Sequence, residues 1–260
     1  MKDTLRTKGF EMDWFSFGEG EPVLVILPGM SLHSVMESEA SVRHAYAALA
    51  KEYTIYLLER RNNMPDGFSV LDMAEDAAAA IEALGIGGCS VFGTSQGGMI
   101  ALALAARHPS LVSKLVVCST DSRPNDTIRS VIGNWAVLAR SGDRIALNRD
   151  VFAHVYSPAF QERYEKALAC LEDSGTPEEL ERFAILSDAS VSFSIHDELG
   201  NIQCPVHVIG VRNDTVLSGE ASTEIAATLG CDLKMYESTG HAIYDEDPGF
   251  ISLLRTLLQG

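Results

Sequence analysis

The chain has 260 residues, of which 46% are hydrophobic and 22% charged, proportions that are ordinary for a globular protein with a sizeable core. This length fits one large α/β domain, or such a domain with a small insertion. The formal net charge of −16 disfavours nucleic acids and anionic membranes as partners, because both bind positive protein surfaces.

Targeting signals, apolar runs and cysteines indicate where in the cell the protein is expected. Residues 1–8 are charged with no apolar stretch behind them, and no apolar run approaches the length that spans a bilayer. The cysteines are odd in number and form no C-x-x-C pair, a pattern typical of reduced thiols. We therefore expect a cytoplasmic protein without a membrane partner. The cysteines are Cys89, Cys118, Cys170, Cys204 and Cys231.

Apolar runs in chain order predict eight strands in a mostly parallel sheet. An antiparallel hairpin over residues 4–8 and 12–17 comes first. Continuous apolar runs follow, as expected of strands buried on both faces, and helical segments between them indicate that helices cover both faces of the sheet. The runs are residues 22–27, 54–58, 89–92, 114–118, 205–209 and 233–236.

Two helices of the core are predicted with defined ends. One begins at Ser69, which forms a capping-box-like pair with Asp72, and ends at Gly85. Residues 250–258 predict the closing helix. The acidic residues 245–247 are expected at the beginning of that helix, where negative charge is favourable.

Residues 121–199 break the alternation, because they contain helical segments and no buried strand. One helix is predicted to begin at Thr176, with Pro177 at its first position and Glu179 completing a capping box. We expect a helical lid at the carboxyl ends of the strands, inserted after the sixth strand into a core of residues 1–120 and 200–260. An earlier helix presents the apolar stripe Ile128, Val131, Ile132, Trp135, Val137 and Leu138.

The segment Gly93-Thr94-Ser95-Gln96-Gly97 carries the strongest functional signal. It joins an apolar strand to an apolar helix, the context in which G-x-S-x-G forms a tight turn that exposes a nucleophilic serine. Glycine stands two residues either side of the serine because side chains there would clash. The N–H groups that follow lie at a helix N-terminus, where they can stabilise negative charge.

With this turn, the chain resembles a cap-bearing member of the α/β-hydrolase superfamily over nearly its whole length. The similarity also rests on five other segments. They are Leu27-Pro28-Gly29-Met30, Glu59-Arg60-Arg61, the helix 69–84, Gly210-Val211-Arg212-Asn213-Asp214 and Gly240-His241. The resemblance implies an eight-stranded, mostly parallel sheet with helices on both faces and a helical cap. It also implies the catalytic order Ser95, Asp214, His241.

These three residue types fit one chemistry. A serine hydroxyl is a weak nucleophile until a base removes its proton, and the imidazole of His241 titrates near neutrality and can return the proton to the leaving group. An aspartate fixes the imidazole tautomer and stabilises the imidazolium. Asp121, after the sixth strand, competes with Asp214 for this role. The spacing from Gly210 to Asp214 resembles the family's acid loop more closely.

An oxyanion hole is expected from the backbone N–H groups of Gln96, directly after the serine, and Met30, directly after Pro28-Gly29. Many relatives carry His-Gly where this chain has Pro28-Gly29. The Met30 side chain is expected to form a flexible apolar wall of the pocket. His33 fits either the pocket mouth or the surface.

Other chemistries find little support in the sequence. Metal-binding motifs, a dinucleotide fingerprint and a Walker lysine are absent, so we expect no metal and no cofactor. The sequence therefore favours a serine hydrolase that cleaves a small or medium ester-like substrate through an acyl-enzyme, an esterase-like enzyme. Two alternatives stay open: a lyase or C–C bond hydrolase with the same triad, and a non-catalytic ligand receptor. The oligomeric state is not determined.

Overall fold

The computed structural model describes residues 2–7 and 9–260. Eight strands form one sheet in the order β1-β2-β4-β3-β5-β6-β7-β8. The β1–β2 pair is antiparallel and most other pairs are parallel, as the sequence predicted. The β2–β4 pair is also antiparallel, which the sequence did not predict. The strands are β1 (Lys2–Thr7), β2 (Phe10–Phe17), β3 (Val23–Leu27), β4 (Thr54–Arg61), β5 (Cys89–Thr94), β6 (Val112–Cys118), β7 (Val206–Val211) and β8 (Asp232–Tyr236). The predicted hairpin also included Lys8, which lies outside the described residues.

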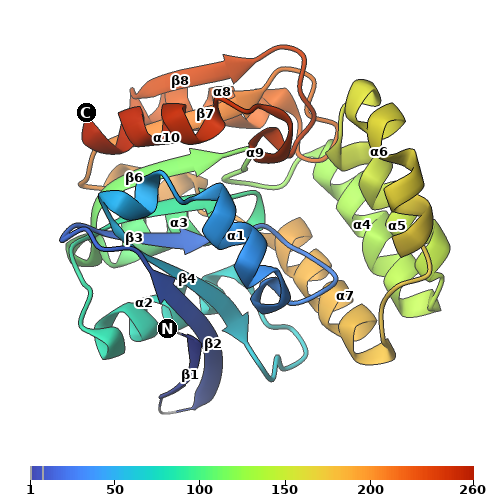
Figure 1. The fold of residues 1–260 in the computed structure, drawn as a ribbon, viewed down its shortest axis with the longest axis horizontal. Coiled ribbons are helices and arrows are strands. Elements are labelled where there is room, and N and C mark those ends of the chain that lie inside the picture. The colour runs from blue at the N-terminus through green and yellow to red at the C-terminus, as the bar shows by residue number, and fades with distance from the viewer. Residues whose placement is uncertain (1, 8) are drawn as a thin grey trace.

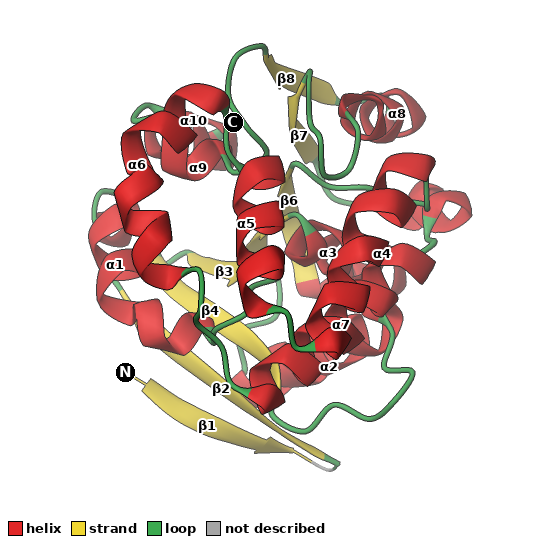
Figure 2. Cartoon of the chain, turned by 90° about the vertical axis from the view of Figure 1, so that its right-hand side faces the viewer, coloured by secondary structure: helices red, strands yellow, loops and turns green. Residues whose placement is uncertain are grey.

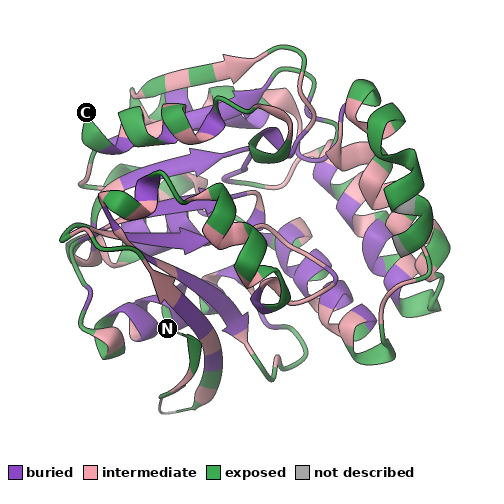
Figure 3. Ribbon diagram, in the orientation of Figure 1, coloured by how far each residue is buried: buried purple, intermediate pink, exposed green. Residues whose placement is uncertain are grey.

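Helices cover both faces of the sheet (Figure 1). Alternate residues of the buried strands enter different cores: Val25 and Leu27 pack with one set of helices, and Leu24 and Ile26 with the other. One side carries α2 (Val70–Leu84), α3 (Gln96–Arg107) and α8 (Gly219–Leu229), and the other carries α1 (Glu39–Ala45) and α10 (Phe250–Gln259). The central strands are almost wholly buried (Figure 3).

Four helices lie between β6 and β7 in the chain: α4 (Asp126–Ser141), α5 (Arg144–Val155), α6 (Pro158–Leu171) and α7 (Pro177–Ser192). They lie beyond the carboxyl ends of β3 and β6, and Figure 2 shows α5 and α6 in front of the strand ends. The remaining helix, α9 (Ile243–Glu246), and four 3₁₀ turns, Val35–Ser38, Leu49–Lys51, Pro109–Leu111 and His196–Asn201, complete the described elements.

The predicted helix starts are confirmed. Ser69 and Asp72 form a capping box at α2, and Thr176 and Glu179 form another at α7. Gly85 ends α2 in the left-handed conformation, with φ of 67°, which glycine adopts at little cost. Among the described residues, no helix is long and apolar enough to cross a membrane.

The apolar stripe predicted for α4 was wrong at one position. Val137 is 64% exposed, whereas Ile128, Ile132, Trp135 and Ala139 are buried. The buried residues recur every three or four positions and share one face of the helix. Val137 follows Trp135 by two positions and therefore points to the opposite side.

Candidate active site

Ser95 occupies a strained turn between β5 and α3. Its φ of 52° and ψ of −124° are unusual for a residue with a Cβ. A Cβ on Gly93 would lie 2.4 Å from the Gly97 carbonyl oxygen, and one on Gly97 would lie 2.0 Å from the Leu27 carbonyl oxygen. The backbone therefore requires glycine at both places, for the reason that the sequence indicated.

Hydrogen bonds hold this turn from both sides. The Ser95 N–H donates to the Cys118 carbonyl at 2.9 Å, and the Ser95 carbonyl accepts from the Thr120 hydroxyl at 2.8 Å. That carbonyl also accepts from Gly98 and Met99 in the first turn of α3. The backbone of Ser95 is thus fixed between the end of β6 and the beginning of α3.

His241 and Asp214 form a buried pair. Their exposed fractions are 4% and 7%, and Nδ1 of His241 donates to Oδ2 of Asp214 at 2.8 Å. Oδ1 of Asp214 accepts from the N–H groups of Val216 and Leu217 at 2.8 and 3.0 Å. Burial alone raises the pKa of Asp214, but the His241 charge and these hydrogen bonds bring it below its usual value. With the proton on Nδ1, neutral His241 presents Nε2 as a proton acceptor.

The end of β6 connects the histidine to the serine turn. Cys118 accepts the Ser95 N–H, and the next residue, Ser119, donates its hydroxyl to the His241 carbonyl at 2.9 Å. Ser119 itself has a φ of 44°, a second strained residue at this edge of the sheet. Two consecutive residues therefore hold the backbones of Ser95 and His241.

Asp121, the competing acid, has different partners. Its carboxylate accepts from the N–H of Arg123 at 2.5 Å and from the amide of Asn125 at 2.8 Å. Burial raises the pKa of Asp121 to about 7, although the hydrogen bond from Arg123 opposes this rise. Asp214, and not Asp121, is the carboxylate bound to His241.

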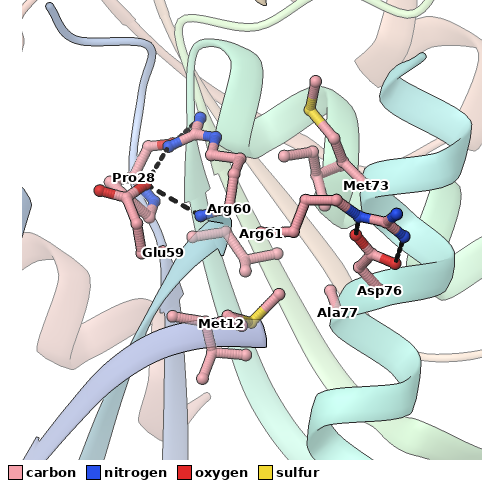
Figure 4. Close-up of a pocket in the computed structure, with 11 residues that line it drawn as sticks. Met12, Pro28, Glu59, Arg60, Arg61, Met73, Asp76 and Ala77 are labelled. Atoms are coloured by element: carbon pink, nitrogen blue, oxygen red, sulfur yellow. Dashed lines mark hydrogen bonds and ion pairs between the residues drawn. The ribbon is translucent and has the colours of Figure 1, made fainter. Parts of the chain in front are cut away.

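Arg60 positions the loop that follows β3. Its guanidinium donates to the Pro28 carbonyl at 2.7 Å (Figure 4). It also donates to the Gly29 carbonyl at 3.1 Å and to Oε1 of Gln96 at 3.0 Å. These bonds fix the two stretches whose N–H groups, at Met30 and Gln96, the sequence predicted as oxyanion donors. Burial lowers the pKa of Arg60 to about 10. Arg61 points away and pairs with Asp76.

The Glu59 side chain connects the loop after β3 to α7. Its carboxylate accepts from Arg182 of α7 at 2.8 Å and from the Ser34 hydroxyl and Val35 N–H at 3.0 Å each. The Gln96 side chain makes a second connection, donating to the Leu186 carbonyl at 2.7 Å. The sequence showed Glu59 and Arg60 only as part of a motif. The available signal was a pair of charged residues at the end of an apolar run.

The histidine loop is joined to the α5–α6 junction. Glu246 accepts from the N–H groups of Gly240 at 3.1 Å and Ser157 at 2.7 Å, and Ala242 donates to the Val155 carbonyl at 3.1 Å. A Cβ on Gly240 would lie 2.5 Å from the Ser157 nitrogen, so the close approach requires glycine.

The expectation that residues 245–247 begin the final helix was therefore wrong. They belong to α9 and the turn after it, and α10 begins only at Phe250. The carboxylates of these residues bind groups that the tertiary fold brings close to them. A local pattern of charges does not predict such partners. Tyr156 donates to Asp245, and Tyr236 donates to Asp247.

A cavity of about 510 Å³ opens beside the serine turn. Met30 and Thr94 line it, so Met30 contributes a wall as expected. A Cβ on Gly29, another lining residue, would lie 3.4 Å from Cβ of Ser95. His33 instead bonds Glu179 at 2.8 Å, where α7 begins. No cluster of metal-ligating side chains occurs in the described part of the chain.

A family model described as the alpha/beta hydrolase fold matches residues 22–157, more than half of the chain. The chain belongs to the α/β-hydrolase family. The match includes the serine turn and the loop held by Arg60. Sequence relatives extend this similarity to the region of Asp214 and His241.

Two α/β-hydrolase relatives cover almost the whole chain. RutD of Escherichia coli O157:H7, described as a carbamate hydrolase, is 29% identical over an alignment of 252 residues, which covers 92% of this chain and 91% of RutD. Pyrrolizixenacetamide deacetylase of Xenorhabdus hominickii is 26% identical over 251 residues, with 93% and 92% covered. Both names are those of hydrolases, in line with the enzyme class that the sequence indicated.

Solved structures show the same fold. The α/β hydrolase MGS-M2, from a Medee basin deep-sea metagenome library, superposes with a TM-score of 0.88 at 20% identity, covering 99% of this chain and 98% of its own. The enol-lactonase of Burkholderia xenovorans LB400 gives a TM-score of 0.84 at 22% identity, covering 99% and 100%. At these identities the likeness shows the fold alone.

Proposed function

We propose that the protein is a cofactor-independent serine hydrolase that cleaves an ester-like bond through an acyl-enzyme intermediate. The observation that carries the proposal is the buried hydrogen bond from His241 to Asp214, held by the same strand end as the strained Ser95. A base oriented by a buried carboxylate, together with a half-buried serine on a strained turn, is the arrangement that nucleophilic catalysis requires.

The proposed reaction assigns one role to each of these groups. Nε2 of His241 removes the Ser95 proton as Oγ attacks the substrate carbonyl, and the ionised Asp214 stabilises the imidazolium that forms. The N–H groups of Met30 and Gln96 stabilise the oxyanion. The imidazolium then protonates the leaving group, and a water molecule, deprotonated by His241, releases the acid and restores Ser95.

We further propose that residues 121–199 act as a cap on a core of residues 1–120 and 200–260. Helices α4 to α7 lie over the strand ends, and three contacts join them to the site: Arg182 with Glu59, Gln96 with Leu186, and Ser157 with Glu246. The cap would exclude water from the acyl transfer, which strengthens the electrostatic contacts within the site.

The substrate would carry a carbonyl flanked by a leaving group. The related enzymes are named for carbamate, acetamide and enol-lactone substrates, all of which share this feature. An ester-like group on a small or medium molecule fits a cavity of about 510 Å³. The relatives named as hydrolases support hydrolysis more directly than the lyase or receptor alternatives.

The test is hydrolysis of 4-nitrophenyl acetate, butyrate and octanoate, together with labelling by a fluorophosphonate. Ser95→Ala should lower kcat by about a thousandfold or more and abolish the labelled peptide, since it removes the nucleophile. Ser130→Ala, an exposed change on α4, is the matched control and should retain both. Turnover that survives Ser95→Ala would exclude this nucleophile. Intact protein that neither turns over nor labels would favour the lyase or receptor.

A further inference from the structure

The cavity beside Ser95 combines one carboxylate with three aromatic rings. The rings belong to Tyr46 after α1, Tyr156 after α5 and Tyr244 in α9, and the carboxylate belongs to Asp245. None of the described residues that line the cavity is a lysine, arginine or histidine. The cavity lining therefore carries one carboxylate and three aromatic rings, and it also includes Gly29 and Met30 beside the nucleophile.

Asp245 has no cationic partner among the described residues. Its Oδ2 accepts a hydrogen bond from the Tyr156 hydroxyl at 3.0 Å, which leaves the carboxylate charge without an ion pair. The neighbouring Glu246 is instead occupied by the N–H groups of Gly240 and Ser157. Asp245 is exposed, so a cation that enters the cavity can reach its carboxylate. Such a cation would form the ion pair that Asp245 lacks.

Two of the three rings, those of Tyr156 and Tyr244, pack against other aromatic rings. Tyr156 stacks on Phe160 with centroids 4.4 Å apart and an interplanar angle of 10°. Tyr244, 37% exposed, packs edge-on against Phe250 with centroids 6.3 Å apart. Ring faces attract cations through their quadrupole, and rings fixed before binding lose little entropy when a ligand arrives.

We propose that this cavity binds the cationic ammonium group of an amine-bearing or trialkylammonium-bearing substrate. Asp245 neutralises the charge and Tyr46, Tyr156 and Tyr244 surround it. The assignment of the remainder of the molecule, an ester-like group at Ser95, rests on the proposed hydrolase function. The net charge of −16 acts in the same direction, because a negative protein concentrates cations near its surface.

The first experiment measures binding alone, by isothermal titration calorimetry at low salt. The ligands are choline, ethanolamine and 3,3-dimethyl-1-butanol, which has the shape of choline without its charge. At least one of the two cations should bind about tenfold more tightly than the neutral alcohol. Asp245→Asn should remove that preference. Asp232→Asn, an exposed loss of the same charge at the beginning of β8, should retain it.

The binding measurement is decisive whether or not the protein is a hydrolase. If neither cation binds more tightly than 3,3-dimethyl-1-butanol, or if Asp245→Asn keeps the preference, the ammonium site is wrong. A thermal melt of Asp245→Asn verifies that the variant is folded. A second ring variant, Tyr244→Leu, should weaken binding of the preferred cation while leaving the neutral alcohol unchanged.

Hydrolysis then connects the two proposals. Acetylcholine should have a kcat/KM about tenfold above that of 3,3-dimethylbutyl acetate, and Asp245→Asn should equalise the two. If ethanolamine is the preferred cation, 2-aminoethyl acetate replaces acetylcholine. Hydrolysis of both esters at equal rates would overturn the ammonium site alone. Cation binding without turnover of any ester would overturn the hydrolase and leave the binding site standing.

Discussion

Ser95 and Ser119 keep left-handed backbone conformations, each of which costs about 1–3 kcal/mol for a residue with a side chain. Both lie at the carboxyl ends of neighbouring strands, and hydrogen bonds of the surrounding loops hold them there. The strained turn places Ser95 directly before α3, and the hydroxyl of the strained Ser119 binds the His241 carbonyl. The strained backbone conformations therefore occur at residues that position the proposed catalytic groups.

At the same scale, Asp214→Asn should lower kcat/KM for 4-nitrophenyl acetate by about a thousandfold or more, because an amide in this place favours the wrong His241 tautomer. The depressed pKa of Asp214 means that the carboxylate also stabilises the fold, a contribution present above its unfolded pKa and lost as pH falls through its folded value. Asp121→Asn, measured beside it, should keep most of the activity. Equal losses in both variants would contradict the assignment of the acid.

Residues of the site differ in how visible they are in the sequence. Gly93 and Gly97 predicted the serine turn because glycine is required where backbones approach closely, and that requirement is local. The hydrogen bonds of Arg60 to Pro28 and of Glu246 to Ser157 join residues 32 and 89 positions apart. No local pattern specifies such partners, so only the tertiary structure reveals these contacts.

Between elements, Glu59 makes a buried connection from α7 to the loop after β3, in addition to the hydrogen bond of His33 to Glu179. Glu59 bridges Arg182 of α7 and the N–H of Val35, so it couples a helix of the proposed cap to the loop beside the proposed oxyanion donors. Burial opposes ionisation of Glu59, but Arg182, Arg60 and the backbone N–H groups lower its pKa below the usual value. The pair is therefore charged and mostly buried.

Arg182→Met should cost about 2–3 kcal/mol in the free energy of unfolding, because it removes one partner of a buried charge. Arg140→Met breaks an exposed pair with Asp188 and should cost less than about 1 kcal/mol. Urea unfolding of both variants measures the difference. Hydrogen exchange should also rise at residues 34–38 in Arg182→Met alone. Similar losses in the two variants would show that Glu59 does not connect these elements.

The helices and strands were predicted closely where a single sequence pattern determines them. Apolar runs located every strand of the sheet, and capping boxes located the beginnings of α2 and α7. The prediction for β4 ended at Leu58, whereas the strand continues to Arg61, because Glu59 and Arg60 are buried with their charges paired. Helices α1 and α8 were not predicted at all. Their sequences lack the regular apolar stripe that identified α2.

Across the whole molecule there are 36 acidic and 20 basic side chains. Changes in pH and salt therefore affect both the stability of the protein and the rate at which charged ligands reach it. Most ion pairs are on the surface and contribute little individually. The buried carboxylates of Glu59, Asp121 and Asp214 matter more, since the fold changes the pKa of each. For Asp121, neither a cation nor the hydrogen bonds of the carboxylate offset the rise in pKa that burial causes.

Asp121 should therefore make the stability of the whole protein fall as pH rises from about 4 to about 7. In this window the unfolded chain releases the Asp121 proton while the folded state, in which the pKa is about 7, retains it. The shift corresponds to a loss on the order of 4 kcal/mol, complete above the folded pKa. Asp121→Asn, which cannot ionise, removes this component and keeps an oxygen for the Arg123 N–H.

Other groups also titrate between pH 4 and pH 7, so the prediction concerns the difference between two proteins. Urea unfolding at pH 5, 6.5 and 8 should show Asp121→Asn gaining stability relative to the parent protein at each step. The gain should level off above pH 7, where the parent has already lost its proton. Parallel pH profiles would mean that Asp121 ionises normally in the folded state, and its place between β6 and α4 would then be solvated enough to hold the charge.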